Sequence, residues 1–144
     1  MFIILIWHCF CYIGYNQIQI QIMNLHEKIA ILGGCDNPNK IGFLATKYLF
    51  NKGFNVFPVT HKKAVIDGIE LHEATENQQA DVVTIFLNPK RQKPFYEYIF
   101  SLKPKKIIFN PGTENEELAT LAQLRNINVI KGCTIALFSN NIMA

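Results

Sequence analysis

From Lys28 onward, short apolar runs of strand length alternate with segments of helical periodicity. The runs are KIAIL (28–32), NVFPV (55–59), DVVTIFL (81–87), KKIIF (105–109) and INVI (127–130). Helices are predicted at 41–52, 94–102 and 114–126, with a short one at 133–139. Because strands that alternate with helices form right-handed β-α-β units, the chain is predicted to be α/β: a Rossmann-like three-layer sandwich with a five-stranded, mainly parallel sheet.

The link between the second and third apolar runs is the hardest part of the chain to interpret. HKKAVIDGIELHEA (61–74) is treated as an irregular connection with a turn at Asp67 and Gly68. Thr75 to Gln79 has room for at most one helical turn. No strand is therefore expected between 61 and 79.

Residues 1–26 form an apolar leader that contains no Asp, Glu, Lys or Arg. The leader lacks the basic start and small-residue cleavage site of a secretory signal, and its apolar run is shorter than a ~20-residue membrane span. Three interpretations stay open: an upstream extension of a domain that starts at Met23, a weak membrane or secretory signal, or an extra edge strand in NQIQIQI. We favour the first and assign the domain to residues 27–144.

Charge and cysteine content exclude several classes of function. A net charge of +3 with scattered lysines is too mild for nucleic acid, and suits a small anion better. The four cysteines form no CxxC pair and have no metal-ligand spacing with the histidines. We therefore expect a single domain in the reducing cytoplasm, with no metal, no disulfide framework and no membrane association.

Four loops follow the predicted strands and meet at one edge of the sheet. In an open doubly wound sheet the ligand binds at this carboxyl edge, where the strand order reverses. The loops contain GGCDNPNK, VTHKK, LNPKR and NPGTENE, and three of them carry lysine. Each loop could be merely a turn, because Gly, Pro and Asn favour turns for conformational reasons. The shared lysines instead favour an anionic ligand such as a phosphate.

The end of the second strand indicates which kind of nucleotide would fit. A domain that binds NAD normally has G-x-G-x-x-G and an acidic residue after the second strand, and this chain has neither. Thr60, His61, Lys62 and Lys63 occupy that place. Basic residues there suit a ribose that carries a phosphate, as in NADP or coenzyme A.

The segments 28–59, 80–118 and 129–138 together resemble the small stand-alone CoA-binding proteins. Their domain is similar to the CoA-binding domain of succinyl-CoA synthetase α-subunits. The family's first loop reads Gly-Ala-Ser, then Asn-Pro, then Arg. This chain has Gly33, Gly34, Cys35, Asn37, Pro38 and Lys40 at those places.

This resemblance implies that the first loop and the loops after the next three strands hold the cofactor, coenzyme A. Lysine in place of arginine keeps the charge and loses a bidentate contact. The expected cofactor-binding residues are Gly33, Gly34, Cys35, Asn37, Pro38, Lys40, Thr60, His61, Lys62, Lys63, Leu87, Asn88, Pro89, Lys90, Asn110, Pro111, Gly112 and Thr113.

The predicted function is binding of CoA or an acyl-CoA without catalysis, as a binding or regulatory module. The chain has no room for the phosphorylatable histidine domain or the nucleotide-binding partner of a CoA ligase. An NADP-dependent reductase-like enzyme and an interaction subunit with a vestigial nucleotide site are the alternatives. A homo-oligomer or an enzyme partner is compatible with the sequence.

Two cysteines are candidates for a reactive thiol. Cys35 precedes a predicted helix N-terminus, which would lower the pKa of its thiol, and Cys133 follows a strand at the same edge. Either could form a mixed disulfide with CoA. The simpler interpretation, which we favour, is that Cys35 is a small turn residue and Cys133 a buried apolar one.

Overall fold

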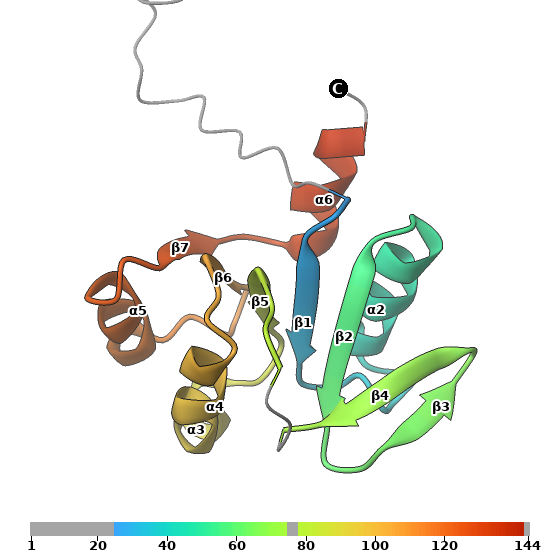
Figure 1. Ribbon diagram of the computed structural model, residues 1–144, viewed down its shortest axis with the longest axis horizontal. Coiled ribbons are helices and arrows are strands. Elements are labelled where there is room, and N and C mark those ends of the chain that lie inside the picture. Colours follow the sequence, from blue (N-terminus) through green and yellow to red (C-terminus); the bar gives the residue numbers. More distant parts are fainter. Residues whose placement is uncertain (1–24, 75–77, 143–144) are drawn as a thin grey trace, which may run out of the picture.

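In the computed structural model, which describes residues 25–74 and 78–142, seven strands form one sheet (Figure 1). The strands are β1 (Lys28–Leu32), β2 (Asn55–Thr60), β3 (Ala64–Ile66), β4 (Ile69–Glu73), β5 (Val82–Ile85), β6 (Lys106–Phe109) and β7 (Asn128–Lys131). The helices are α2 (Ile41–Asn51), α3 (Pro89–Gln92), the 3-10 turn η1 (Lys93–Phe95), α4 (Tyr96–Ser101), α5 (Glu116–Gln123) and α6 (Thr134–Ile142).

The sheet is doubly wound, with the order β3-β4-β2-β1-β5-β6-β7. All neighbouring strands from β4 to β7 in this order pair in parallel, and only β3 is antiparallel. The chain builds outward from β1 through β2 to β4 and then returns to the other side of β1 with β5. The point where the strand order reverses therefore lies between β1 and β5, which is where ligands bind in this architecture.

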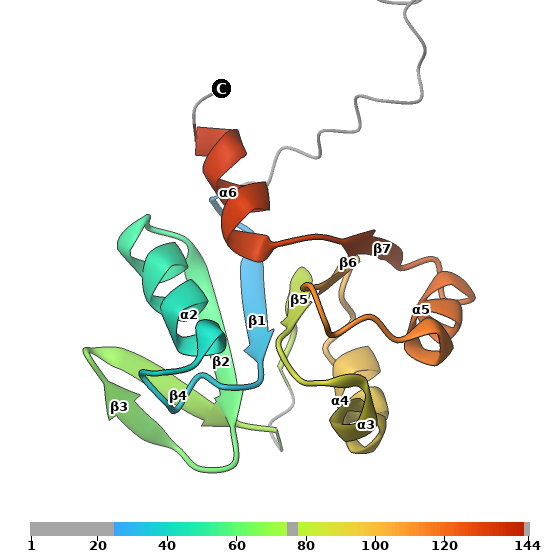
Figure 2. The same ribbon diagram turned by 180° about the vertical axis from the view of Figure 1, so that it is seen from behind.

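Helices cover both faces of the sheet and make the expected three layers. One apolar cluster joins alternate strand residues to α4 and α5, and the other joins the remaining strand residues to α2 and α6. Figure 2 shows α2 beside β1 and β2. The first cluster includes Ala30, Leu32, Val83, Ile85, Ile107, Phe109, Ile99 and Leu118, and the second Ile29, Ile31, Val82, Ile108, Leu49 and Phe138.

The number of strands differs from the prediction of five, because residues 61–74 are not irregular. Asp67 and Gly68, with φ of 52° and 78°, form a two-residue turn between β3 and β4. Positive φ at both central residues is the turn geometry that matches the twist of a β-hairpin. Of the stretch 75–79, residues 75–77 lie outside the described residues, as does the leader up to residue 24.

Two helix boundaries also differ from the prediction. The helix expected at 94–102 begins at Pro89 and is divided into α3, η1 and α4. Pro94 has no N–H to donate within a helix, and the chain tightens into a 3-10 turn around it. The helix expected at 114–126 is shorter, because the Asn115 side chain accepts from the Leu118 N–H at 3.2 Å and caps α5 at Glu116.

Asp81 ties three strands together at the amino edge of the sheet. Its carboxylate accepts from the Lys28 N–H at 2.9 Å, and its own N–H donates to the Lys28 carbonyl at 2.8 Å. Its carbonyl accepts from the Lys105 N–H at 2.9 Å, and the Lys105 ammonium lies 3.3 Å from the carboxylate. The Lys28 N–H is the main cause that lowers the pKa of Asp81 below its ordinary value.

Asp81→Asn is expected to lower the free energy of unfolding near neutral pH by about 1 kcal/mol, because the carboxylate is partly solvent-screened. A carboxylate whose pKa is lower in the folded state stabilises the protein fully at pH values above its unfolded-state pKa. This stabilisation is lost as the pH falls through the folded-state pKa. The difference between wild type and variant, measured by urea unfolding, should therefore narrow below about pH 4.

Asp67→Asn is the matched control, because it breaks the exposed Lys47–Asp67 pair. That change should leave the unfolding free energy nearly unchanged across the same pH range. Equal stability of Asp81→Asn and wild type at neutral pH would contradict the assignment.

Candidate functional site

The loop after β1 turns tightly enough to bring α2 against the end of the sheet. Gly33 and Gly34 have φ of +106° and +71°, a region that residues with a side chain rarely adopt. A Cβ on Gly33 would lie 2.9 Å from the Leu87 backbone nitrogen, and one on Gly42 would overlap the Gly33 carbonyl oxygen. The three glycines thus allow the close contacts between β1, α2 and the loop after β5.

The N-terminus of α2 opens at this edge without a side-chain cap. Lys40 is the N-cap residue in an extended conformation, and the first turn of α2 contains no acidic residue. Asn37 fixes the turn that precedes the helix. Its carbonyl accepts a hydrogen bond from the Lys40 N–H, and its side chain accepts one from the Asn39 N–H, both at 2.9 Å. The first N–H groups and the helix dipole therefore favour an anion here.

A cleft of about 750 Å³ lies at the point where the strand order reverses. Its walls come from the first loop, the ends of β1 and β2, and the segment from Leu87 through η1. This volume is in the range of small-molecule and cofactor sites. The lining residues are Leu32, Gly33, Gly34, Asp36, Asn37, Pro38, Lys40, Val59, Thr60, His61, Leu87, Arg91, Pro94 and Phe95.

Two cations face the cleft from different walls. Lys40 comes from the first loop and Arg91 from α3, and both side chains are exposed. Within the described residues neither forms an ion pair with a carboxylate. Asp36, the acidic residue of the lining, lies on the first loop. The two cations are thus available to an anionic ligand that spans the cleft.

The wall formed by the third loop is partly apolar. Leu87 and Phe95 are half-buried, and Pro94 lies beside them in the lining. The His61 ring, from the end of β2, lies 6.4 Å from the Phe95 ring at an angle of 49°. The cleft therefore offers flat, apolar surfaces on one side and hydrogen-bond donors on the other.

The structure brings part of the predicted site together. Of the expected residues, the lining contains Gly33, Gly34, Asn37, Pro38, Lys40, Thr60, His61 and Leu87. The expected residues that do not line the cleft are Cys35, Lys62, Lys63, Asn88, Pro89, Lys90, Asn110, Pro111, Gly112 and Thr113.

The fourth loop supports the edge of the sheet from inside. Asn110 is buried, and its side chain donates to the Thr84 hydroxyl and the Ile85 carbonyl, both at 2.9 Å. Its Oδ1 accepts from the Thr134 N–H at 2.9 Å, which joins α6 to β5 and β6. The buried Thr113 hydroxyl donates to the Asn110 carbonyl at 2.8 Å. These contacts are internal and explain why polar residues follow β6.

Sequence reasoning missed Arg91, Pro94 and Phe95, together with Leu32, Asp36 and Val59 of the lining. The expected site ended at Lys90 although the third loop, LNPKR, includes Arg91, and Pro94 and Phe95 were assigned to the helix expected at 94–102. Pro89 was the available signal, since proline is over-represented at the first position of a helix. A helix that starts there turns Arg91 and Phe95 toward the carboxyl edge.

The thiol of Cys35 points away from the cleft, into the core. Cys35 is fully buried, and its Sγ lies 3.4 Å from the Ile31 carbonyl oxygen. Burial is the main cause that raises the pKa of the Cys35 thiol to about 12, so the expectation of a lowered pKa is wrong. The interpretation of Cys133 as a buried residue is also wrong, because Cys133 is exposed. Cys133 does not line the cleft.

The two thiols should therefore differ strongly in reactivity. Iodoacetamide is expected to alkylate Cys133 in the native protein near pH 8, because it is exposed, while the neutral, buried Cys35 is alkylated only after unfolding. Peptide mass mapping measures the two sites separately, and alkylation in denaturant is the control. Equal alkylation of Cys35 and Cys133 in the native protein would contradict the burial of Cys35.

Doubly wound sheets with a glycine-rich turn and a helix N-terminus at the switch point define the Rossmann-like class of nucleotide-binding domains. The family model "CoA binding domain" matches residues 27–139. The chain therefore belongs to the CoA-binding domain family, as the resemblance in its sequence implied.

Solved structures have the same fold. A protein described as uncharacterized is 38% identical, with a TM-score of 0.74, covering 82% of this chain and 99% of that chain. A conserved hypothetical protein from Pyrococcus furiosus is 28% identical, with a TM-score of 0.66 and coverage of 76% and 97%. A hypothetical protein from Pyrococcus horikoshii OT3 is 22% identical, with a TM-score of 0.72 and coverage of 81% and 84%, and is similar in fold.

Two features are absent from the described residues 25–74 and 78–142. None of the helices there is both long and apolar enough to span a membrane. The same residues also bring together no group of three or more His, Cys, Asp or Glu side chains that could hold a metal ion.

Proposed function

We propose that this protein binds coenzyme A or an acyl-CoA in the cleft between β1 and β5, as a non-catalytic binding or regulatory module. The observation that carries the proposal is the uncapped N-terminus of α2, which opens into the cleft with Lys40 and Arg91 on either side. A helix N-terminus with nearby cations is suited to a diphosphate. Membership of the CoA-binding domain family supports CoA as the source of that diphosphate.

In this proposal the first loop holds the diphosphate through backbone N–H groups. Gly33 and Gly34 let the backbone approach the ligand, and Lys40 supplies a point charge. The first loop has a lysine where the family has an arginine, so it lacks a bidentate guanidinium contact. Arg91 provides that contact from α3. The loop from Asn110 to Thr113 contributes by supporting the wall.

The end of β2 favours CoA over NAD. Thr60 and His61 line the cleft where an NAD-binding domain would place an acidic residue. Lys62 and Lys63 follow directly and are exposed, close enough in sequence to attract the phosphate on the CoA ribose. The half-buried Leu87 and Phe95 suit the less polar part of the ligand.

A ligand panel tests the proposal against its two alternatives. CoA at about a hundredfold excess over its Kd should stabilise the full-length protein by about 2.7 kcal/mol, which raises the Tm by several degrees. NADP and ADP should raise the Tm less. A larger shift with NADP than with CoA would favour the reductase-like enzyme, and no shift with any ligand would favour a vestigial site.

Arg91→Ala and Lys90→Ala form a matched pair for the same measurement, because the two residues are adjacent, exposed and equally charged. Arg91 lines the cleft and Lys90 does not. A hydrogen bond to a charged group contributes about 1.5–3 kcal/mol. Arg91→Ala should therefore reduce the CoA-induced shift clearly and Lys90→Ala little. Equal reduction by both variants would remove Arg91 from the site.

Lys62 and Lys63 are expected to contact the 3′-phosphate on the ribose of CoA. Lys62→Ala combined with Lys63→Ala should weaken CoA more than 3′-dephospho-CoA, because only CoA carries that phosphate. Isothermal titration calorimetry with both ligands measures the difference. A double variant that weakens both ligands equally would remove the assignment.

A further inference from the structure

A buried glutamine lies directly behind the cleft wall. Gln92 is the last residue of α3, has no exposed surface, and belongs to the helix that carries Arg91 into the cleft. Glutamine is seldom fully buried, because an unpaired amide in the core is costly. The partners of this amide therefore indicate what it does.

The Gln92 amide uses both of its N–H donors and accepts one hydrogen bond at its oxygen. Its Nε2 donates to the Leu87 carbonyl at 2.9 Å and to the Thr113 carbonyl at 2.7 Å. Its Oε1 accepts from the Asn115 Nδ2 at 3.0 Å. The two carbonyls belong to different loops, those after β5 and β6, so one side chain joins both to the end of α3.

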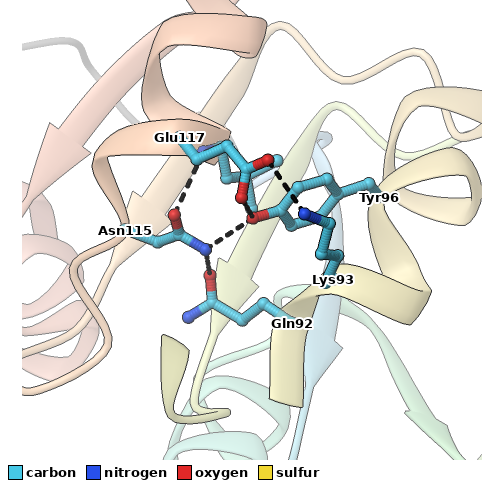
Figure 3. A network of polar contacts seen from close by, with 6 residues as sticks. Gln92, Lys93, Tyr96, Asn115 and Glu117 are labelled. Atoms are coloured by element: carbon cyan, nitrogen blue, oxygen red, sulfur yellow. Dashed lines mark hydrogen bonds and ion pairs between the residues drawn. The ribbon is translucent and has the colours of Figure 1, made fainter. Parts of the chain in front are cut away.

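The chain of contacts continues beyond Gln92 (Figure 3). Asn115 caps α5 with its Oδ1 and donates its Nδ2 also to the Tyr96 hydroxyl at 2.8 Å. The Tyr96 hydroxyl donates to Glu117 at 3.2 Å, and Lys93 lies 3.3 Å from the other carboxylate oxygen of Glu117. The network thus joins η1 and α4 to the start of α5, and Gln92 is its buried end.

We infer that Gln92 is a positioning residue for the ligand site, which fixes the wall that carries Leu87 and Arg91. Leu87 lines the cleft, and its carbonyl is one of the two groups that Gln92 holds. The inference rests on the proposed CoA binding. Gln92 itself does not line the cleft, so its effect on affinity must pass through its neighbours.

Simple packing does not account for the choice of residue. An apolar side chain of similar size would fill the same space, but it would leave the Leu87 and Thr113 carbonyls and the Asn115 amide without this partner. What only the amide provides is a fixed distance between the Leu87 and Thr113 carbonyls. The wall of the cleft between them is thereby held in one arrangement before the ligand arrives, which lowers the cost of binding.

A double-mutant cycle distinguishes positioning from general stability. Gln92→Leu, Arg91→Ala and Lys40→Ala are made singly, and Gln92→Leu is combined with each of the other two. CoA affinity is measured by isothermal titration calorimetry on the full-length protein. Gln92→Leu is expected to weaken CoA about tenfold, as is typical of a change that disturbs one contact to a charged group.

The positioning role predicts that the losses from Gln92→Leu and Arg91→Ala do not multiply. Once Arg91 is absent, loosening the wall that carried it should reduce the affinity for CoA little further. The double variant should therefore bind CoA nearly as well as Arg91→Ala alone. With Lys40→Ala, on the other wall, the losses should multiply to within about twofold. Losses that multiply in both pairs would overturn the inference.

A stability control separates the loss of positioning from a general loss of stability, and a second Gln92 variant replaces the first if that one does not fold. Ile99→Val, at a fully buried position of α4, lowers stability but removes no hydrogen bond of the network, and it should leave CoA affinity unchanged. Gln92→Glu retains the side-chain length and serves if Gln92→Leu does not fold. A loss with Ile99→Val equal to that with the Gln92 variants would overturn the inference.

Hydrogen exchange gives a readout that needs no ligand. In the Gln92 variants the Arg91 and Thr113 N–H groups, which bond the Asn88 and Asn110 carbonyls, should exchange faster together, while those of α2 should not. Unchanged exchange at both would overturn the inference. If the wild type does not bind CoA, both the proposed function and the role of Gln92 are removed. If the wild type binds CoA and the Gln92 variants bind it with the same affinity, only the role of Gln92 is removed.

Discussion

The close approach of α2 to the end of β1 is the constraint on which the site depends. The approach is possible because Gly33 lies against Leu87 and Gly42 against the Gly33 carbonyl, where a Cβ would collide. With larger residues the first loop would have to widen and α2 would move away from the sheet. The helix N-terminus would then no longer open at the place where the strand order reverses, and the cleft would lose its anion-binding end.

The two edges of the sheet differ in how their charges are used. At the amino edge the charges are paired: Asp81 holds the Lys28 N–H and the Lys105 ammonium, and the nearly buried Lys106 lies 3.0 Å from Glu27. Such pairs fix the start of the strands and leave little charge for a ligand. At the carboxyl edge Lys40 and Arg91 face the cleft without an ion-pair partner in the described chain. The charges at the amino edge are thus paired with one another, whereas two cations at the carboxyl edge stay available to a ligand.

Features that depend on local pattern could be predicted from the sequence, and those that depend on tertiary contacts could not. The alternation of apolar runs and helices predicted the doubly wound core, and Gly53 marks the end of α2 with a φ of +86°. The β3–β4 hairpin was missed although its Asp-Gly turn was recognised, because β3 is short and its partner β4 is mixed in polarity.

The site could be predicted as an edge of the sheet but not residue by residue. Loop membership cannot tell which way a side chain points: Cys35 turns into the core and Asn110 into a buried network, although both follow strands at the correct edge. Gln92 was not visible as a functional residue because its role depends on two carbonyls, which sequence does not reveal.

The central claim is that a diphosphate lies at the N-terminus of α2, and a ¹⁵N–¹H NMR titration of the full-length protein with CoA tests it most directly. The account predicts that the amide signals of Gly34, Ile41 and Gly42, at the start of α2, shift most and saturate together, with signals of the β3–β4 hairpin turn unaffected. Shifts centred on the hairpin or on the amino edge, with the signals at the start of α2 unmoved, would contradict it.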